Sequence, residues 1–324
     1  MPDDTIRAES QSPPRETNAA SSREKHSGIS TIFLGPNGIR AGWRILLAIC
    51  FFQGISYAVG RILSRIPYVV SHFPPIRAGV PTVLTAGLMI YYESRFAFCL
   101  LAAVLLMKLI ERRSFADYGL PLNQFLGKRF WIGVPFGFAL LSLLLGTIAA
   151  LHGFSLGPVE LTSAAALKYA FLYGIVFIIG AFCEEFAFRG YLQATLGSGI
   201  GFWFAAILLS ILFGALHLSN WGEAIVGAAS AGAFGLVAAF SLARTGSIWF
   251  AIGLHAAWDW AETYFYGVPD SGMMAKGHLF TGTVHGPNWL TGGTVGPEGS
   301  YFVLGVLAVS AIGIHFLFPA KRDA

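Results

Sequence analysis

A series of long apolar runs is the feature that most restricts what this chain can fold into. A helix needs roughly 17–25 apolar residues to cross a bilayer, and helices satisfy their own backbone hydrogen bonds there. Hydrophobic residues make up 55% of the 324 residues and charged residues 12%, unlike a soluble domain. We therefore predict an all-α polytopic membrane protein with about eight transmembrane helices, at residues 43–63, 84–110, 130–151, 166–190, 201–218, 224–243, 247–266 and 301–318.

A polar N-terminal segment precedes these runs. Residues 1–38 are rich in Ser, Pro and charges of both signs, a composition that cannot bury a core. We expect a disordered cytoplasmic tail there and a single transmembrane domain over residues 39–324. The net charge of +4 comes from basic residues beside apolar runs, so we interpret it as contact with the lipid bilayer and not with nucleic acid.

The basic residues also predict an orientation. With eight spans, both termini lie on the same side as the basic loop that joins the second and third spans, which the positive-inside rule places in the cytoplasm. Arg61, Arg65 and Arg77 fall on the opposite side and count against this assignment. On the basis of Lys108, Arg112, Arg113, Lys128 and Arg129 we expect both termini to be cytoplasmic. The composition is typical of a bacterial protein, so we expect an integral protein of the bacterial cytoplasmic membrane.

One charged stretch follows directly on an apolar run. Glu184, Glu185 and Arg189 lie at the end of the fourth predicted span, where an ionised group costs roughly 2.5 kcal/mol or more. Glu185 and Arg189 are four residues apart and meet on one helical face, which leaves Glu184 free to face a cavity. The alternative is a buried ion network that locks helices together.

Two further pairs have the same i, i+4 spacing. Phe213 and His217 end the fifth span, where Gly214 would let a neighbouring helix approach closely. His255 and Asp259 face one side of the seventh span. Taken singly, His217 is explained by an interfacial or hydrogen-bonded histidine, and His255 with Asp259 by a self-satisfied pair.

The conjunction of the three pairs is more informative than any one of them. A helical hairpin that turns near Gly197–Gly201 brings Glu184 and His217 to similar depth, and His255 returns on another helix. We predict a polar catalytic cavity between helices four, five and seven. A carboxylate and an imidazole there can activate water, and a second imidazole can stabilise an oxyanion. The same residue types can also bind zinc or relay protons.

Two other polar features are assigned roles outside this cavity. Glu93 and Arg95 lie near one end of the second span, and we interpret them as snorkelling residues or an interfacial pair, with a contribution to the cavity as the alternative. The glycine-rich stretch 267–300 is placed on the outer face by the predicted topology, where composition does not distinguish a lid from a connector.

The motifs resemble those of the CAAX protease and bacteriocin-processing family of intramembrane endopeptidases, which includes the Ras-converting CAAX prenyl endopeptidase. The family pattern is EExxxR, FxxxH and then HxxxN or HxxxD. Its positions are filled in order within about residues 165–266, by Glu184, Glu185, Arg189, Phe213, His217, His255 and Asp259.

The resemblance implies a role for each matched position. Glu184 would activate water together with His217, and Arg189 would hold Glu185. His255 would stabilise the oxyanion, with Phe213 supporting the site. The prenyl endopeptidases have Asn where this chain has Asp259, and an ionised aspartate cannot donate a hydrogen bond. We therefore expect Asp259 to orient His255 through its other ring nitrogen.

The resemblance also implies a reaction class. We expect a peptidase that hydrolyses membrane-anchored or transmembrane peptide substrates by a metalloprotease or a glutamate-type mechanism. A divalent metal such as zinc, if used, would be bound by Glu184, His217 and His255, and a metal-free mechanism fits equally. The alternatives are a proton-coupled membrane transporter and a catalytically silent membrane scaffold.

Overall fold

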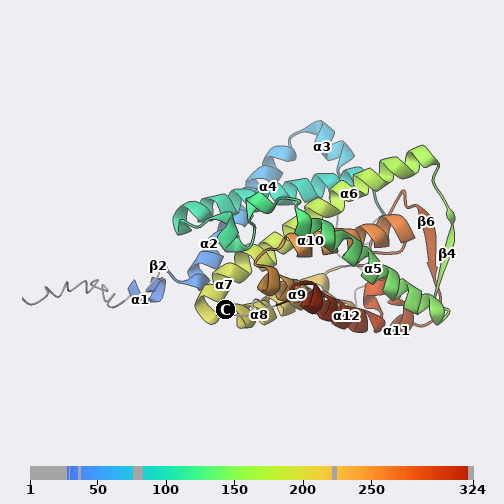
Figure 1. The fold of residues 1–324 in the computed structure, drawn as a ribbon. Helices are drawn as coiled ribbons and strands as arrows, with labels where there is room; N and C mark the ends of the chain where they lie inside the picture. The colour runs from blue at the N-terminus through green and yellow to red at the C-terminus, as the bar shows by residue number, and fades with distance from the viewer. Residues whose placement is uncertain (1–27, 29, 36–37, 76–82, 221–224, 320–324) are drawn as a thin grey trace, which may run out of the picture. The chain divides into compact units, whose positions relative to one another are not determined.

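The structure is a computed structural model, and it divides the chain into residues 1–40 and residues 41–324 (Figure 1). In the first unit, α1 (Ser30–Phe33) precedes β1 (Leu34–Gly35) and β2 (Gly38–Ile39), and the two strands pair antiparallel. Most of the expected disordered tail falls outside the described residues, which are 28, 30–35, 38–75, 83–220 and 225–319.

The second unit is mostly helical, and a helix occupies each of the predicted apolar runs. These helices are α2 (Ala41–Leu63), α4 (Ala86–Glu111), α5 (Lys128–Ala150), α6 (Ser163–Glu185), α8 (Phe202–His217), α9 (Ile225–Thr245), α10 (Trp249–Trp260) and α12 (Phe302–Leu317). Shorter elements join them: α3 (Pro67–His72), β3 (Val83–Leu84), η1 (Phe115–Tyr118), η2 (Leu122–Gln124), β4 (Phe154–Val159), η3 (Phe186–Leu192), α7 (Gln193–Ile200), η4 (Ala261–Tyr266), β5 (Met274–Ala275), β6 (Phe280–Val284), α11 (Asn288–Thr291) and η5 (Pro297–Gly299).

Length and composition mark part of this helical unit as membrane-spanning. Within the described residues, four helical stretches are long and apolar enough to cross a bilayer: Ala41–Leu63, Lys128–Ala150, Ser163–Ile200 and Ile225–Thr245. Of the remaining helices, α8, α10 and α12 are shorter, and α4 carries Glu93 and Arg95 within its first half. The protein is an integral, mostly helical membrane protein, and eight crossings stay a prediction.

The fourth apolar run belongs to a much longer helical stretch than residues 166–190. α6, η3 and α7 form one continuous stretch of 38 residues, Ser163–Ile200. At about 1.5 Å per residue this stretch is about 57 Å long, which exceeds the thickness of the hydrocarbon layer. It ends at Gly201, whose φ of 89° lets the chain reverse into α8. The turn expected near Gly197–Gly201 is therefore confirmed.

Glycines bring the backbones of two helix pairs into contact. A Cβ on Gly137 of α5 would lie 2.0 Å from the carbonyl oxygen of Leu254, and one on Gly253 of α10 would lie 2.2 Å from that of Phe130. Between α8 and α9, a Cβ on Gly214 would lie 2.3 Å from the Ala228 carbonyl oxygen. The close approach predicted at Gly214 is confirmed, and α8 is held against α9 by backbone packing.

Helix α10 lies between the two apolar cores. Ile252 and Ala256 belong to a cluster shared with α4 and α6, whereas Phe250 and Leu254 belong to a cluster shared with α5 and α12. Because α10 is covered on both sides, its polar residue His255 has a closely fixed position.

The stretch 267–300 is folded back onto other elements. β6 pairs antiparallel with β4 (Figure 1), and β5 pairs parallel with β3. The two ends of the stretch 267–300 also meet, because the Gly272 N–H donates to the Val295 carbonyl at 2.8 Å. A Cβ on Gly296 (φ 104°) would lie 1.9 Å from the Pro269 carbonyl oxygen, so this contact requires glycine. The stretch is thus an ordered cap whose ends lie side by side.

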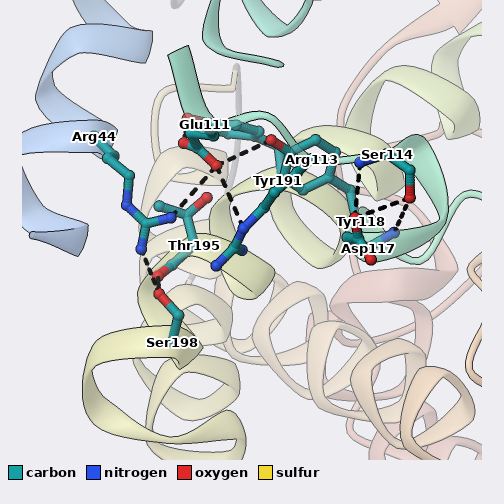
Figure 2. A network of polar contacts seen from close by, with 9 residues as sticks. All are labelled: Arg44, Glu111, Arg113, Ser114, Asp117, Tyr118, Tyr191, Thr195 and Ser198. Atoms are coloured by element: carbon teal, nitrogen blue, oxygen red, sulfur yellow. Dashed lines mark hydrogen bonds and ion pairs between the residues drawn. The ribbon is translucent and has the colours of Figure 1, made fainter. Parts of the chain in front are cut away.

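A polar network ties the far end of the long helical stretch to its neighbours (Figure 2). Glu111, at the end of α4, accepts hydrogen bonds from the hydroxyls of Tyr191 (2.8 Å) and Tyr118 (3.0 Å) and from Arg44 of α2 (3.4 Å). Tyr118 lies in η1, where Ser114 and Asp117 form a capping box. Three helices and the η1 turn are thereby joined beside η3, the segment that carries Arg189.

Candidate functional site

Two of the motif-bearing helices change to π-helical geometry beside their charged residues. α6 becomes the π-helical η3 immediately after Glu185, and Arg189 lies inside it. α10 becomes the π-helical η4 immediately after Trp260, next to Asp259. Single π-helical turns are rare and occur often at functional sites.

Glu185 is fully buried and connects two motifs. Its Oε1 accepts a hydrogen bond from Nη1 of Arg189 at 3.2 Å and one from Nδ1 of His255 at 3.0 Å. The contact predicted between Glu185 and Arg189 is confirmed. An ionised carboxylate can only accept, so Nδ1 of His255 carries a hydrogen and the ring has a fixed orientation. Glu185, and not Asp259, therefore occupies the orienting position at Nδ1.

The other nitrogen of His255 faces two more carboxylates. Nε2 lies 3.5 Å from Oδ2 of Asp259 and 3.8 Å from Oε2 of Glu184. The Glu184 side chain is 40% exposed, whereas that of Glu185 is 0% exposed. Adjacent glutamates thus have opposite surroundings: one is packed against an arginine, and the other faces open space.

His217 has a fixed tautomer. Its Nδ1 lies 2.8 Å from the carbonyl oxygen of Phe213, which can only accept, so Nδ1 donates and Nε2 is left as an acceptor. The Phe213 ring packs edge-on against the imidazole with centroids 4.6 Å apart. The i, i+4 pair therefore orients a basic nitrogen at the end of α8.

Arg189 is held by packing as well as by charge. Its guanidinium carbon lies 4.2 Å from the centroid of the Phe213 ring, and its Nε donates to the Gly235 carbonyl at 3.4 Å. A Cβ on Gly235 would lie 2.5 Å from Nη2 of Arg189. Gly235 of α9 thus makes room for the arginine, a role that no sequence motif indicated.

These residues surround one cavity of about 350 Å³. Glu184, His217, His255 and Asp259 all line it, whereas Glu185 and Arg189 lie behind its wall. Apolar side chains complete it, among them Met89, Phe96, Phe177, Leu216 and Phe234. The cavity contains acid and imidazole groups beside an apolar surface.

Glu93 also lines this cavity, so its interpretation as half of an interfacial pair was wrong. Its carboxylate lies 3.5 Å from the position of a Cβ on Gly180, opposite α6. Arg95 points elsewhere and donates to the Ser56 carbonyl at 3.4 Å. Residues two apart on a helix face different directions, and that spacing was the available signal.

The ends of the 267–300 cap contribute acidic residues that the motifs did not indicate. Asp270 and Glu298 line the cavity beside Asp259. Burial, followed by the charge of Glu298, raises the pKa of Asp270 to about 8. Acidic residues in an otherwise glycine-rich stretch were the signal in the sequence.

The geometry bears on where a metal could bind. Among the described His, Cys, Asp and Glu side chains, Asp259, Asp270 and Glu298 offer ligand atoms that all lie within 4.8 Å of one another. Glu184, His217 and His255 do not form such a group. As arranged here, those three do not fit a single tetrahedral ion, for which ligands must approach within about 2.0–2.2 Å of the metal.

Residues 166–261 match the model of a family described as Type II CAAX prenyl endopeptidase Rce1-like. The match contains every motif position from Glu184 to Asp259. Over this segment the chain is similar to the CAAX protease family. Members of that family are membrane-embedded peptidases, so the similarity indicates this class of protein. A comparison with curated proteins finds no match.

Proposed function

We propose that this protein is an intramembrane endopeptidase of the CAAX protease family. In this proposal it hydrolyses peptide bonds of membrane-associated substrates with a water activated by Glu184 and His217. The observation that carries the proposal is the convergence of Glu184, His217 and His255 on one cavity. They come from α6, α8 and α10.

Glu184 and His217 are suited to accept the proton of the attacking water. Glu184 faces the cavity, and His217 presents Nε2 as an acceptor because Nδ1 is bound to the Phe213 carbonyl. Two acceptors on one water orient its lone pair and take its proton as it attacks a carbonyl carbon. The proton then passes to the leaving amine.

His255 is suited to stabilise the oxyanion. Glu185 holds Nδ1, and the carboxylates of Glu184 and Asp259 near Nε2 favour a ring that carries hydrogen on both nitrogens. Nε2–H then donates to the oxygen that becomes negative in the tetrahedral intermediate. Asp259 contributes part of the negative charge beside this ring. No step is routed through a metal.

The substrate class follows from the lining of the cavity. Aromatic and aliphatic side chains from α4, α6, α8 and α9 surround the polar residues. Such a surface fits apolar residues of a transmembrane or lipid-anchored peptide that enters from the bilayer. We propose this class of substrate.

Turnover by purified protein tests the proposal. A fluorogenic library of apolar peptides is incubated with the full chain in detergent, with and without a strong chelator. Wild type should cleave, and Glu184→Gln and His217→Ala should each lose about 100-fold or more in kcat/KM. Glu160→Gln, an exposed carboxylate on the β4 side, is the matched control and should cleave normally.

The outcomes separate the alternatives. Cleavage at the wild-type rate by Glu184→Gln would overturn the role of Glu184. Absence of turnover by wild type, together with proton flux across proteoliposomes, would identify a proton-coupled transporter. Absence of both would favour a catalytically silent scaffold.

A further inference from the structure

A group of carboxylates lies at the end of the cavity next to the 267–300 cap. Oxygen atoms of Asp259, Asp270 and Glu298 all lie within 4.8 Å of one another. Asp259 comes from α10, whereas Asp270 and Glu298 come from opposite ends of the cap. Three like charges this close repel one another strongly unless something neutralises them.

A fourth carboxylate, that of Glu262, lies beside the cap, with Oε1 3.3 Å from the position of a Cβ on Gly296. Glu262 is 0% exposed, and neither of its side-chain oxygens has a hydrogen bond to any described residue. Its carboxylate experiences the charges of Glu298, Asp270 and Asp259. The indole N–H of Trp258 also lies near Glu262, but it donates to Glu298 at 3.1 Å. A buried carboxylate without a partner is costly, which indicates a missing positive group.

The described protein supplies little positive charge here. None of the described residues that line the cavity is a lysine or an arginine. Arg189 lies behind the wall and is used by Glu185. His255 lies 3.5 Å from Asp259 and is shared with Glu184 and Glu185. One imidazole cannot neutralise the carboxylates of this group.

Two of the three converging carboxylates accept hydrogen bonds from neighbouring hydroxyls, and the third lies beside an imidazole. Thr263 Oγ1 donates to Asp270 at 3.1 Å, and Ser271 Oγ donates to Glu298 at 2.8 Å. His255 Nε2 lies beside Asp259. Such outer donors are typical of metal sites, where they fix the direction of the ligands.

We propose that Asp259, Asp270 and Glu298 bind one hard divalent cation of the size of Ca²⁺, with Glu262 as a further acidic neighbour. Carboxylate oxygens suit Ca²⁺ or Mg²⁺, and no cysteine belongs to the group. Three oxygens within 4.8 Å of one another lie at most about 2.8 Å from a common centre, so small side-chain movements bring them to the Ca²⁺–O distance of about 2.4 Å. Mg²⁺, at about 2.1 Å, requires them to move closer.

Binding at this place would join both ends of the cap to α10. Asp270 and Glu298 belong to the two ends that already meet through the bond between Gly272 and Val295. Asp259 adjoins His255, so the ion would also fix the cavity wall beside the imidazole. The proposed cation site does not depend on the proposed peptidase activity. Its tests measure ion binding and thermal stability.

Thermal unfolding of the full chain in detergent tests the site. After treatment with a chelator, Ca²⁺ should raise Tm by about 5 °C at saturation. The double variant Asp270→Asn/Glu298→Gln should lose this rise but melt no lower than wild type without Ca²⁺, because both amides keep an acceptor and remove repulsion. Glu160→Gln should retain the rise.

Terbium luminescence provides a second, independent measurement. Tb³⁺ binds at Ca²⁺ sites, and the indole of Trp258 beside Glu298 can sensitise its emission. We expect saturable emission that Ca²⁺ displaces, and an affinity about 100-fold weaker in Asp270→Asn/Glu298→Gln. The Glu160→Gln control should titrate as wild type does.

Three results would overturn the proposal. One is the absence of any rise in Tm with Ca²⁺, Mg²⁺ or Mn²⁺ in wild type. Another is a rise that persists in the double variant. The third is a double variant that melts lower than wild type while still binding Tb³⁺ with wild-type affinity, because the carboxylates would then have a structural role alone.

Discussion

Glu184 and Glu185 are neighbours in the chain and have different environments in the fold. Glu185 is enclosed with Arg189 and His255, whereas Glu184 faces the cavity with 40% of its side chain exposed. Two carboxylates in different environments can serve different purposes, one chemical and one positional. We assign the positional part to Glu185 and the chemical part to Glu184.

Replacing each glutamate by glutamine should separate these parts. Glu185→Gln leaves Arg189 buried without a counter-ion and should lower the free energy of unfolding by about 3 kcal/mol. Glu184→Gln should leave stability within about 0.5 kcal/mol of wild type while cleavage is lost. Thermal melting and peptide turnover of the same preparations measure both. Equal destabilisation by the two variants would contradict the assignment.

The raised pKa of Asp270 predicts that the stability of the fold depends on pH. Burial and the Glu298 charge raise its pKa to about 8, from an ordinary value of 3.8. The folded state therefore holds a proton that the unfolded state has released, so this group's contribution to stability falls as pH rises from about 4 to about 8. In the absence of divalent cations, the Tm of wild type should fall more over this pH interval than the Tm of Asp270→Asn. An identical pH profile for the two would contradict it.

At the scale of elements, the site depends on helices whose backbones touch. Gly214 holds α8 against α9, and Gly235 of α9 leaves room for Arg189 of η3. Arg189 in turn packs on Phe213, one helical turn before His217. The positions that we propose as catalytic on α6 and α8 are therefore linked through α9.

A methyl group on Gly235 should disturb this coupling. Its Cβ would lie 2.5 Å from Nη2 of Arg189 and 2.9 Å from Oγ of Ser210, so Gly235→Ala should cost about 1–3 kcal/mol and reduce turnover. Gly305→Ala on α12 is the control, because its Cβ meets nothing within 4 Å. It should be neutral or stabilising by up to about 1 kcal/mol. Similar losses in both variants would indicate a general cost of alanine.

If side chains on two helices act on one water, mutations of both should reduce kcat/KM non-additively. If Glu184 of α6 and His217 of α8 both accept from the same water, the double variant Glu184→Gln/His217→Ala should be about as slow as the slower single variant. A double-mutant cycle on kcat/KM measures this. Multiplicative losses would show that the two side chains act independently.

At the scale of the whole molecule, much of the helical framework could be predicted from the sequence. Apolar runs located the long helices, and i, i+4 spacing paired Glu185 with Arg189 and Phe213 with His217. These features follow from local periodicity. The number of membrane crossings and the orientation stay predictions, because helix lengths alone do not determine them.

The remaining features depend on packing between distant segments. Glu93 faces the cavity because of how α4 lies against α6, and Asp270 and Glu298 reach it because the ends of the cap meet. The π-helical turns after Glu185 and Trp260 likewise have no periodic signal in the sequence. The contact of Glu185 with Nδ1 of His255 joins residues 70 positions apart. Motif spacing within each helix could not predict that contact.

A comparison of peptide termini in membranes tests most directly whether Glu184 is required for proteolysis by this protein. Mass spectrometry would compare the same cells expressing wild type, Glu184→Gln or Glu160→Gln at matched levels. We expect a set of new termini shared by wild type and Glu160→Gln and missing with Glu184→Gln. The same termini in the Glu184→Gln membranes, or none that depend on the wild-type protein, would contradict it.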